Sequence, residues 1–118
     1  MDIDWLRNYC LAKKGVEETL PFGPDVLVFK VMGKVFLLCP LTTDILQFNA
    51  KCHPDEAEEM RATYTAVQPG FHMNKNHWNT ITVDGSIPVK LLKEWIDCSY
   101  ELVVKSLPKK TKDLLAQL

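Results

Sequence analysis

The stretch VLVFKVMGKVFLLC, residues 26–39, decides the fold class of this chain. Its two halves, 26–31 and 34–39, are rich in β-branched and aromatic residues, which predicts two strands. Between them, Met32-Gly33 provides a tight turn, because glycine adopts the positive φ that two-residue hairpin turns require. The sequence therefore predicts a β-hairpin, and with it an antiparallel sheet.

Two further segments extend this sheet. In residues 45–51, apolar side chains at every second position alternate with Gln47, Asn49 and Lys51, so one face of this strand is expected to meet water. Residues 78–83 alternate in a similar way and predict another strand. Because the alternation leaves one wet face, helices need to cover only one side of the sheet.

Four segments have helical periodicity: residues 4–14, 54–63, 87–105 and 109–118. Asp2 or Asp4 is expected to cap the first of these helices, and Ser86 the third, by accepting amide hydrogens of the first turn. The last helix is expected to bury three leucines, namely Leu114, Leu115 and Leu118.

The order of these elements predicts the architecture. The connector 17–24 holds two prolines and a glycine and leaves room for a short edge pairing around Thr19-Leu20. Helices and hairpin strands in this order indicate an α+β two-layer sandwich, with about five antiparallel strands and the helices on one face. A length of 118 residues suits a single domain over residues 1–118.

Charge is spread unevenly along the chain. Residues 1–59 hold six Lys and Arg against ten Asp and Glu, a net charge of −4, whereas residues 60–118 hold eight against five, a net charge of +3. The two halves sum to −1, so the whole chain has no strong attraction for polyanions. The basic C-terminal half permits nucleic-acid contact without requiring it.

The four cysteines, Cys10, Cys39, Cys52 and Cys98, lie far apart and form no CxxC or metal-type pair. We expect them to be reduced and mostly buried, in a cytoplasmic protein. Residues 1–4 are acidic and lack the basic start and apolar run of a signal peptide. Since no apolar run approaches the length of a membrane span, we expect no membrane partner.

The most unusual residues gather in PGFHMNKNHWNT, residues 69–80, a turn-rich segment that leads into a strand. Loops held on a rigid scaffold often carry function. The candidate site therefore consists of His72, Asn74, Lys75, His77, Trp78 and Asn79. The competing interpretation is structural: asparagines hydrogen-bond their own backbone in turns, and a tryptophan packs in the core.

Catalytic and metal-binding patterns are weak. His72 and His77 are five residues apart, which places them on one face of neither a helix nor a strand, and a metal would need further ligands such as His53 or a cysteine. The adjacent Cys52-His53 pair offers no activated nucleophile, and the chain has no glycine-rich phosphate loop. We therefore expect no metal, no cofactor and no enzymatic activity.

The run HMNKNHWNT at 72–80, followed by DGSIP at 84–88, resembles the signature of the MmcQ/YjbR family. The segments LRNYCL at 6–11, GVEE at 15–18 and PF at 21–22 are similar to the opening helix and connector of that family. Its closing helix is matched by SYELV at 99–103 and SLP at 106–108. The resemblance therefore spans nearly the whole chain.

The resemblance implies a fold similar to that of bacterial frataxin and a role as a double-wing DNA-binding protein, and it brings no enzymatic activity. Weak, phosphate-directed DNA binding would use the candidate site together with a lysine cluster formed by Lys109, Lys110 and Lys112. A different class of function stays open. In it, Phe71, Met73 and Trp78 line a pocket beside the sheet, for a small molecule or a partner protein.

Overall fold

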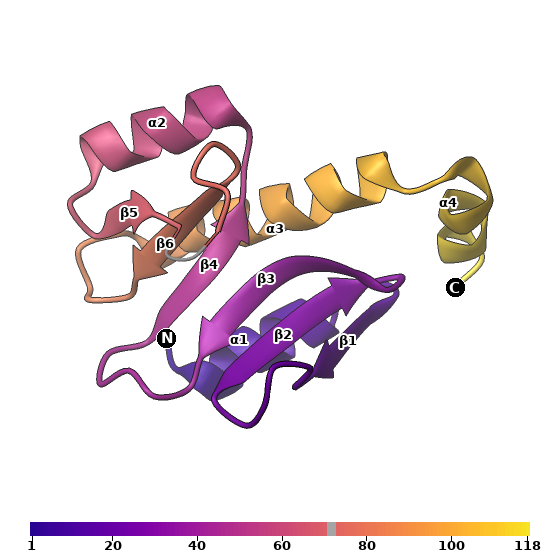
Figure 1. The fold of residues 1–118 in the computed structure, drawn as a ribbon, viewed down its shortest axis with the longest axis horizontal. Helices are drawn as coiled ribbons and strands as arrows, with labels where there is room; N and C mark the ends of the chain where they lie inside the picture. The colour runs from indigo at the N-terminus through magenta and orange to yellow at the C-terminus, as the bar shows by residue number, and fades with distance from the viewer. Residues whose placement is uncertain (71–72) are drawn as a thin grey trace.

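The computed structural model describes residues 1–70 and 73–118. In that part of the chain, six strands form one antiparallel sheet in the order β1-β2-β3-β4-β6-β5 (Figure 1). The strands are β1 (Val16–Thr19), β2 (Val26–Val31), β3 (Lys34–Pro40), β4 (Gln47–Lys51), β5 (Val67–Pro69) and β6 (Trp78–Thr82). The predicted antiparallel sheet is confirmed, with one strand more than the expected five.

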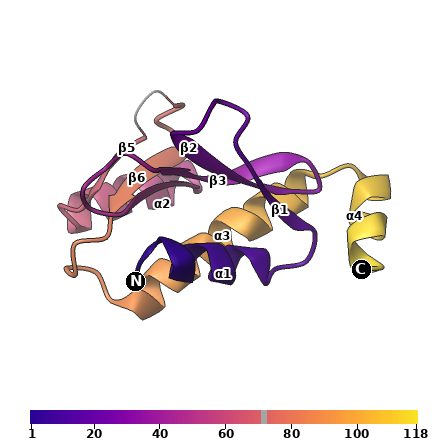
Figure 2. The same cartoon turned by 90° about the horizontal axis from the view of Figure 1, so that it is seen from below.

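The helices are α1 (Ile3–Leu11), α2 (Pro54–Thr63), α3 (Val89–Ser106) and α4 (Lys109–Ala116). Seen edge-on in Figure 2, the sheet carries α1 and α3 on the same face. The α+β architecture with helices on one face is thus confirmed, and the likeness to bacterial frataxin stays a prediction. Among the described residues, no helix is both long and apolar enough to span a membrane.

β2 and β3 form a hairpin at the predicted turn, Met32-Gly33. Val31 pairs with Lys34, and the two residues between them have positive φ, 49° at Met32 and 85° at Gly33. This is the backbone of a type I′ turn, whose twist matches that of the flanking strands. The observed β2 coincides with the predicted strand, because turn and strand signals agree there.

The two edge strands have weaker signals. β1 covers Val16–Thr19 and pairs with β2, where only a short pairing around Thr19 was expected. The unforeseen β5 is three residues long, pairs with β6, and ends at Pro69. A proline is tolerated there because an edge strand does not need every N–H for a neighbour. A segment this short has no alternation to identify it.

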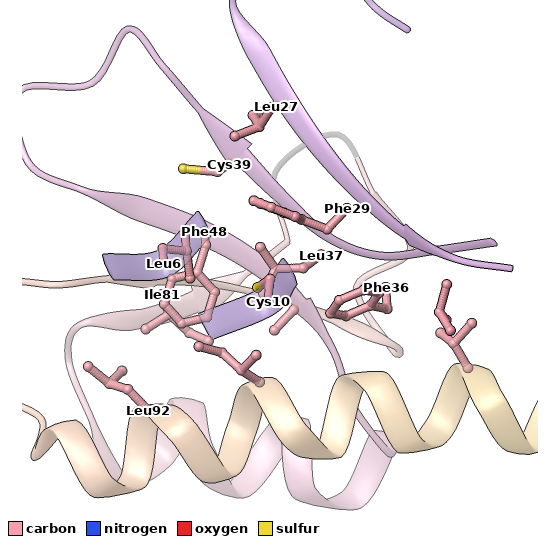
Figure 3. Packing of buried hydrophobic residues seen from close by; sticks show 14 of the residues in the cluster. Leu6, Cys10, Leu27, Phe29, Phe36, Leu37, Cys39, Phe48, Ile81 and Leu92 are labelled. Carbon is pink, nitrogen blue, oxygen red and sulfur yellow. The ribbon is translucent and has the colours of Figure 1, made fainter. Parts of the chain in front are cut away.

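The hydrophobic core lies between the sheet and the helices α1 and α3. Figure 3 shows Leu6 and Cys10 of α1 gathered with Phe48 of β4, Ile81 of β6 and Leu92 of α3. Each of these side chains is at most 1% exposed. Burying a large aliphatic or aromatic side chain contributes about 1.5–3 kcal/mol, so this contact fixes α3 against the sheet.

Helix starts follow the expectations only in part. Asp2 caps α1, because its side chain accepts a 2.9 Å hydrogen bond from the Trp5 amide. The predicted cap of α3 is wrong: Pro88 occupies the N-cap position, and Ser86 donates to the carboxylate of Asp84 instead. The Ser86 hydroxyl is therefore bound within the turn 84–86 and does not cap α3.

The inward orientation predicted for the last helix holds for one leucine of three. Leu115 is buried beside Gly15, where a Cβ would lie 2.6 Å from the Leu115 methyl. Leu114 and Leu118 are 49% and 65% exposed. The prediction fails because α4 follows the Pro108 break and turns only its Leu115 face to the rest of the chain, beside Gly15 just before β1 begins.

The open face of β4 is less wet than its alternation suggests. Gln47 and Lys51, at the two ends of the strand, are half-buried. Asn49, in its middle, is only 8% exposed. Its side-chain oxygen accepts a hydrogen bond from the hydroxyl of Thr80, its partner on β6. A central strand therefore buries this amide, and the neighbouring strand satisfies it.

Candidate functional site

The connection between β5 and β6 holds the residues singled out by the sequence. The two ends of this connection are joined at Gly70, whose N–H donates a 2.8 Å hydrogen bond to the Trp78 carbonyl. A Cβ at Gly70 would lie 2.8 Å from the Trp78 Cβ, so the close approach of the two chains requires glycine. Phe71 and His72 lie outside the described residues.

Asn74 organises the turn that follows. Its side-chain oxygen accepts a 3.0 Å hydrogen bond from the Asn76 amide. Its carbonyl accepts from the amides of His77 and Trp78, at 3.1 and 3.0 Å. The side-chain bond forms the Asx turn that the structural interpretation predicted, and the two backbone bonds extend the turn to Trp78. The side chain of Asn74 is therefore already occupied in shaping the backbone.

Asn79 ties the sheet to α2. It is 0% exposed, and its Nδ2 donates a 3.2 Å hydrogen bond to the Ala57 carbonyl. Its oxygen accepts from Nη1 of Arg61 at 3.3 Å. With donor and acceptor both used inside the protein, Asn79 offers no surface to a ligand, and its expected contact role is replaced by a structural one.

Arg61, which no sequence motif indicated, anchors this loop from α2. Its Nη1 donates a 2.8 Å hydrogen bond to the Lys75 carbonyl. The side chains of Lys75 and His77 remain exposed, and that of Trp78 is half-buried. The loop thus presents a cation and an imidazole to solvent on a backbone that is held at both ends.

The C-terminal lysines do not join this group. Lys109, Lys110 and Lys112 are exposed on α4, which lies beside Gly15 at the start of β1. The β5–β6 connection lies at the other edge of the sheet, as the strand order requires (Figure 1). The single basic surface that the DNA hypothesis combined is therefore divided between opposite edges.

A pocket of about 470 Å³ lies between α2 and α3, over the end of β4. Its buried lining comes from Ala50 and Cys52, which are 2% and 6% exposed. The half-buried lining residues are apolar or aromatic for the most part: Met60, Tyr64, Leu91 and Trp95. Exposed glutamates form the outer rim, namely Glu56, Glu59 and Glu94.

Two aromatic rings form one wall of this pocket. The rings of Tyr64 and Trp95 meet edge to face, with centroids 5.6 Å apart and planes at 72°. Such pairs fix each other in orientation. Since both rings also line the pocket, the wall is held in place before any ligand enters.

Two thiols line the pocket, and neither is ionised near neutral pH. Burial raises the pKa of Cys52 to about 11. Burial and the carboxylate of Glu56, whose Oε2 lies 3.9 Å from the Cys98 sulfur, raise the pKa of Cys98. A nucleophilic cysteine needs a lowered pKa, so these thiols serve as pocket surface. Within the described residues, no group of three or more His, Cys, Asp or Glu is placed to hold a metal ion.

This pocket cannot be recognised from the sequence, because its parts come from three elements. Leu91, Trp95 and Cys98 follow a helical spacing on α3, and periodicity alone does not distinguish a core position from a pocket position. The one available signal was the small apolar content of α2, which leaves this helix unable to fill the space against α3. Only the folded chain shows which side of α2 stays open.

Comparison with known proteins agrees with the fold. The family model described as YjbR matches residues 11–102. Over 118 residues, 100% of both chains, the sequence is 33% identical to the uncharacterized protein YjbR of Escherichia coli strain K12. It is 37% identical over 104 residues to the uncharacterized protein YbdF of Escherichia coli O157:H7, which covers 88% of this chain and 85% of that one.

A solved structure is similar as well. The crystal structure of Deinococcus radiodurans protein DR2400 is 37% identical in sequence and superposes with a TM-score of 0.91, over 97% of this chain and 87% of that one. Sequence and fold therefore agree along the chain, and the protein belongs to the YjbR family.

Proposed function

We propose that this protein binds a small, partly apolar molecule in the pocket between α2 and α3. The observation that carries the proposal is the half-buried pair Tyr64 and Trp95 in a pocket of about 470 Å³. Pockets for small ligands usually have volumes of roughly 300–1,000 Å³ and mostly apolar walls with a few polar groups. The protonated thiols of Cys52 and Cys98 add soft contact surface, and we assign no chemical step to them.

This proposal keeps one of the two functions that the sequence left open and moves its location. The expected pocket lay beside the sheet and was lined by Phe71, Met73 and Trp78, of which Phe71 lies outside the described residues. The observed pocket lies against α2, the helix whose Arg61 holds that loop. A ligand that moves α2 would therefore also act on the loop, through the bond between Arg61 and the Lys75 carbonyl.

A fragment screen followed by ¹H–¹⁵N NMR tests the proposal. Binders should shift the indole N–H signal of Trp95, which a Trp95→Phe variant assigns. Leu91→Trp fills the pocket and should abolish these shifts. Lys90→Trp, on the same helix but outside the pocket lining, should leave them unchanged. Fragments that bind both tryptophan variants equally would reject the pocket.

Nucleic-acid binding is the second candidate, in the double-wing form that the family resemblance implies. In its favour, Lys75 and His77 are exposed, and residues 73–77 rise with residues 20–25 from the sheet face opposite α1 and α3 (Figure 2). Lysines at such positions contact phosphates without reading sequence. The lysines of α4 take no part, because they lie at the other edge of the sheet.

A further inference from the structure

The ionisable groups that line the α2–α3 pocket are mostly acidic. Glu56, Glu59 and Glu94 carry three negative charges, and Lys51 carries the one positive charge of the lining. The lining therefore has a net charge of −2, on a protein whose total is −1. The two thiols add no charge near neutral pH. An anionic ligand would meet repulsion here, and a cation would meet attraction.

The carboxylates come from both sides of the opening. Glu56 and Glu59 stand on α2, and Glu94 stands on α3. Glu56 already has a polar neighbour in the thiol of Cys98. The ion pairs found among the described residues, Arg7–Glu18 and Lys13–Asp97, both lie outside the pocket lining. In the described structure, Glu59 and Glu94 are therefore not neutralised by an ion pair.

The aromatic wall adds a second kind of attraction for the same charge. The face of a tryptophan or tyrosine ring attracts a cation through its quadrupole, and more strongly where solvent is excluded. Tyr64 and Trp95 line the pocket together with the apolar side chains of Met60 and Leu91. The pocket therefore combines apolar surface, aromatic rings and a negative rim, which is the surface expected for an amine on an apolar body.

We propose that the ligand of this pocket is an organic ammonium cation, with its apolar body over Met60 and Leu91 and its charge between Glu59, Glu94 and the aromatic wall. This inference rests on the proposed function, because it names the ligand class of the same pocket. The apolar part provides affinity through burial, and the ammonium group provides selectivity against neutral and acidic molecules of the same shape.

Three probes of one shape separate the inference from the proposed function: 4-phenylbutylamine, 4-phenylbutanol and 4-phenylbutyrate. Each is titrated at neutral pH while the Trp95 indole N–H signal is followed. We expect the amine to bind about tenfold tighter than the alcohol, the size of effect that one cation–π contact and one weak ion pair produce together. The carboxylate should bind more weakly than the alcohol.

The outcomes are distinct. Equal binding of amine and alcohol at Trp95 would overturn the charge inference and leave the pocket function standing. If no probe shifts the Trp95 signal at millimolar concentration and the fragment screen finds no binder, both the charge inference and the proposed pocket function are rejected. If 4-phenylbutyrate binds most tightly, the pocket prefers anions, and the inference of a cationic ligand is overturned.

A matched pair of double variants tests the named carboxylates. Glu59→Gln with Glu94→Gln removes two charges from the pocket, one on each helix. Glu58→Gln with Glu101→Gln removes two charges from the same helices outside the pocket lining. The pocket variant should lose most of the preference for the amine and keep its affinity for the alcohol, whereas the control should keep both. Equal loss in the two variants would trace the preference to overall charge and overturn the inference.

Discussion

The hydroxyl of Tyr9 donates a 2.8 Å hydrogen bond to Oδ1 of Asp97, joining α1 to α3 across 88 positions of sequence. Lys13 donates to the same carboxylate oxygen, and its Nζ lies 4.8 Å from the centroid of the Tyr9 ring. Trp5 stacks on Tyr9 at 5.0 Å. This contact holds α1 on α3, the helix that carries Trp95 into the pocket wall.

The Tyr9 contact predicts a loss of stability in alkali. Burial, with the Asp97 hydrogen bond adding to it, raises the pKa of Tyr9 from 10.0 to about 12. A raised folded-state pKa contributes stability that is complete below pH 10 and is lost as the pH rises towards 12. Urea unfolding with reductant across this range should show a steeper fall in the unfolding free energy for wild type than for Tyr9→Phe. If the unfolding free energies of wild type and Tyr9→Phe fall in parallel with pH, the stabilising role of the Tyr9–Asp97 hydrogen bond is contradicted.

Asn79 should prove to be a stability residue. Asn79→Ala leaves the buried contact with the Ala57 carbonyl unmade and frees Arg61, which should cost about 1–3 kcal/mol of unfolding free energy. Asn74→Ala removes an exposed Asx bond and should cost less, about 1 kcal/mol or below. Thermal and urea unfolding of both variants measure the difference. A larger loss for Asn74→Ala would reverse the roles assigned to the two asparagines.

Thiol reactivity should distinguish one cysteine from the other three. The four cysteines are free, with Cys10, Cys39 and Cys52 buried and Cys98 half-buried. A disulfide-exchange reagent should therefore modify one thiol ahead of the other three in native protein and all four after denaturation, and Cys98→Ser should remove this first phase. Because Cys98 lines the pocket, a pocket ligand should slow that phase. Rapid modification of two or more native thiols would contradict the burial pattern.

The sequence predicted those parts of the fold in which local and tertiary preferences agree. The strand Val26–Val31 was located to the residue, because the turn at Met32-Gly33 and the β-branched run specify the same structure. The strand Val67–Pro69 was missed, since three residues carry no periodicity and pair only because β6 is there. Local patterns do not record a pairing that depends on the loop between two strands.

The candidate site shows the same division. Composition located the loop of Lys75 and His77 and described its turn chemistry correctly, because an Asx turn is a local interaction. Whether a polar residue faces solvent depends on the packing of other elements, so Asn79 was misjudged and Arg61 was overlooked. The pocket of Trp95 was beyond reach for the same reason: it exists only where α2 and α3 fail to close over β4.

The loop itself is tested by charge removal at Lys75. If Lys75 contacts phosphate, Lys75→Ala should weaken duplex DNA binding equally for all sequences and lower the slope of log K against log salt by about one. Lys109→Ala removes the same charge at the opposite edge of the sheet and should leave the slope unchanged. Both lysines are exposed, so unfolding free energies should stay within about 0.5 kcal/mol of wild type. Equal effects of the two variants would indicate attraction by net charge alone, and absence of wild-type binding at low salt would reject the nucleic-acid candidate while leaving the α2–α3 pocket as the site of function.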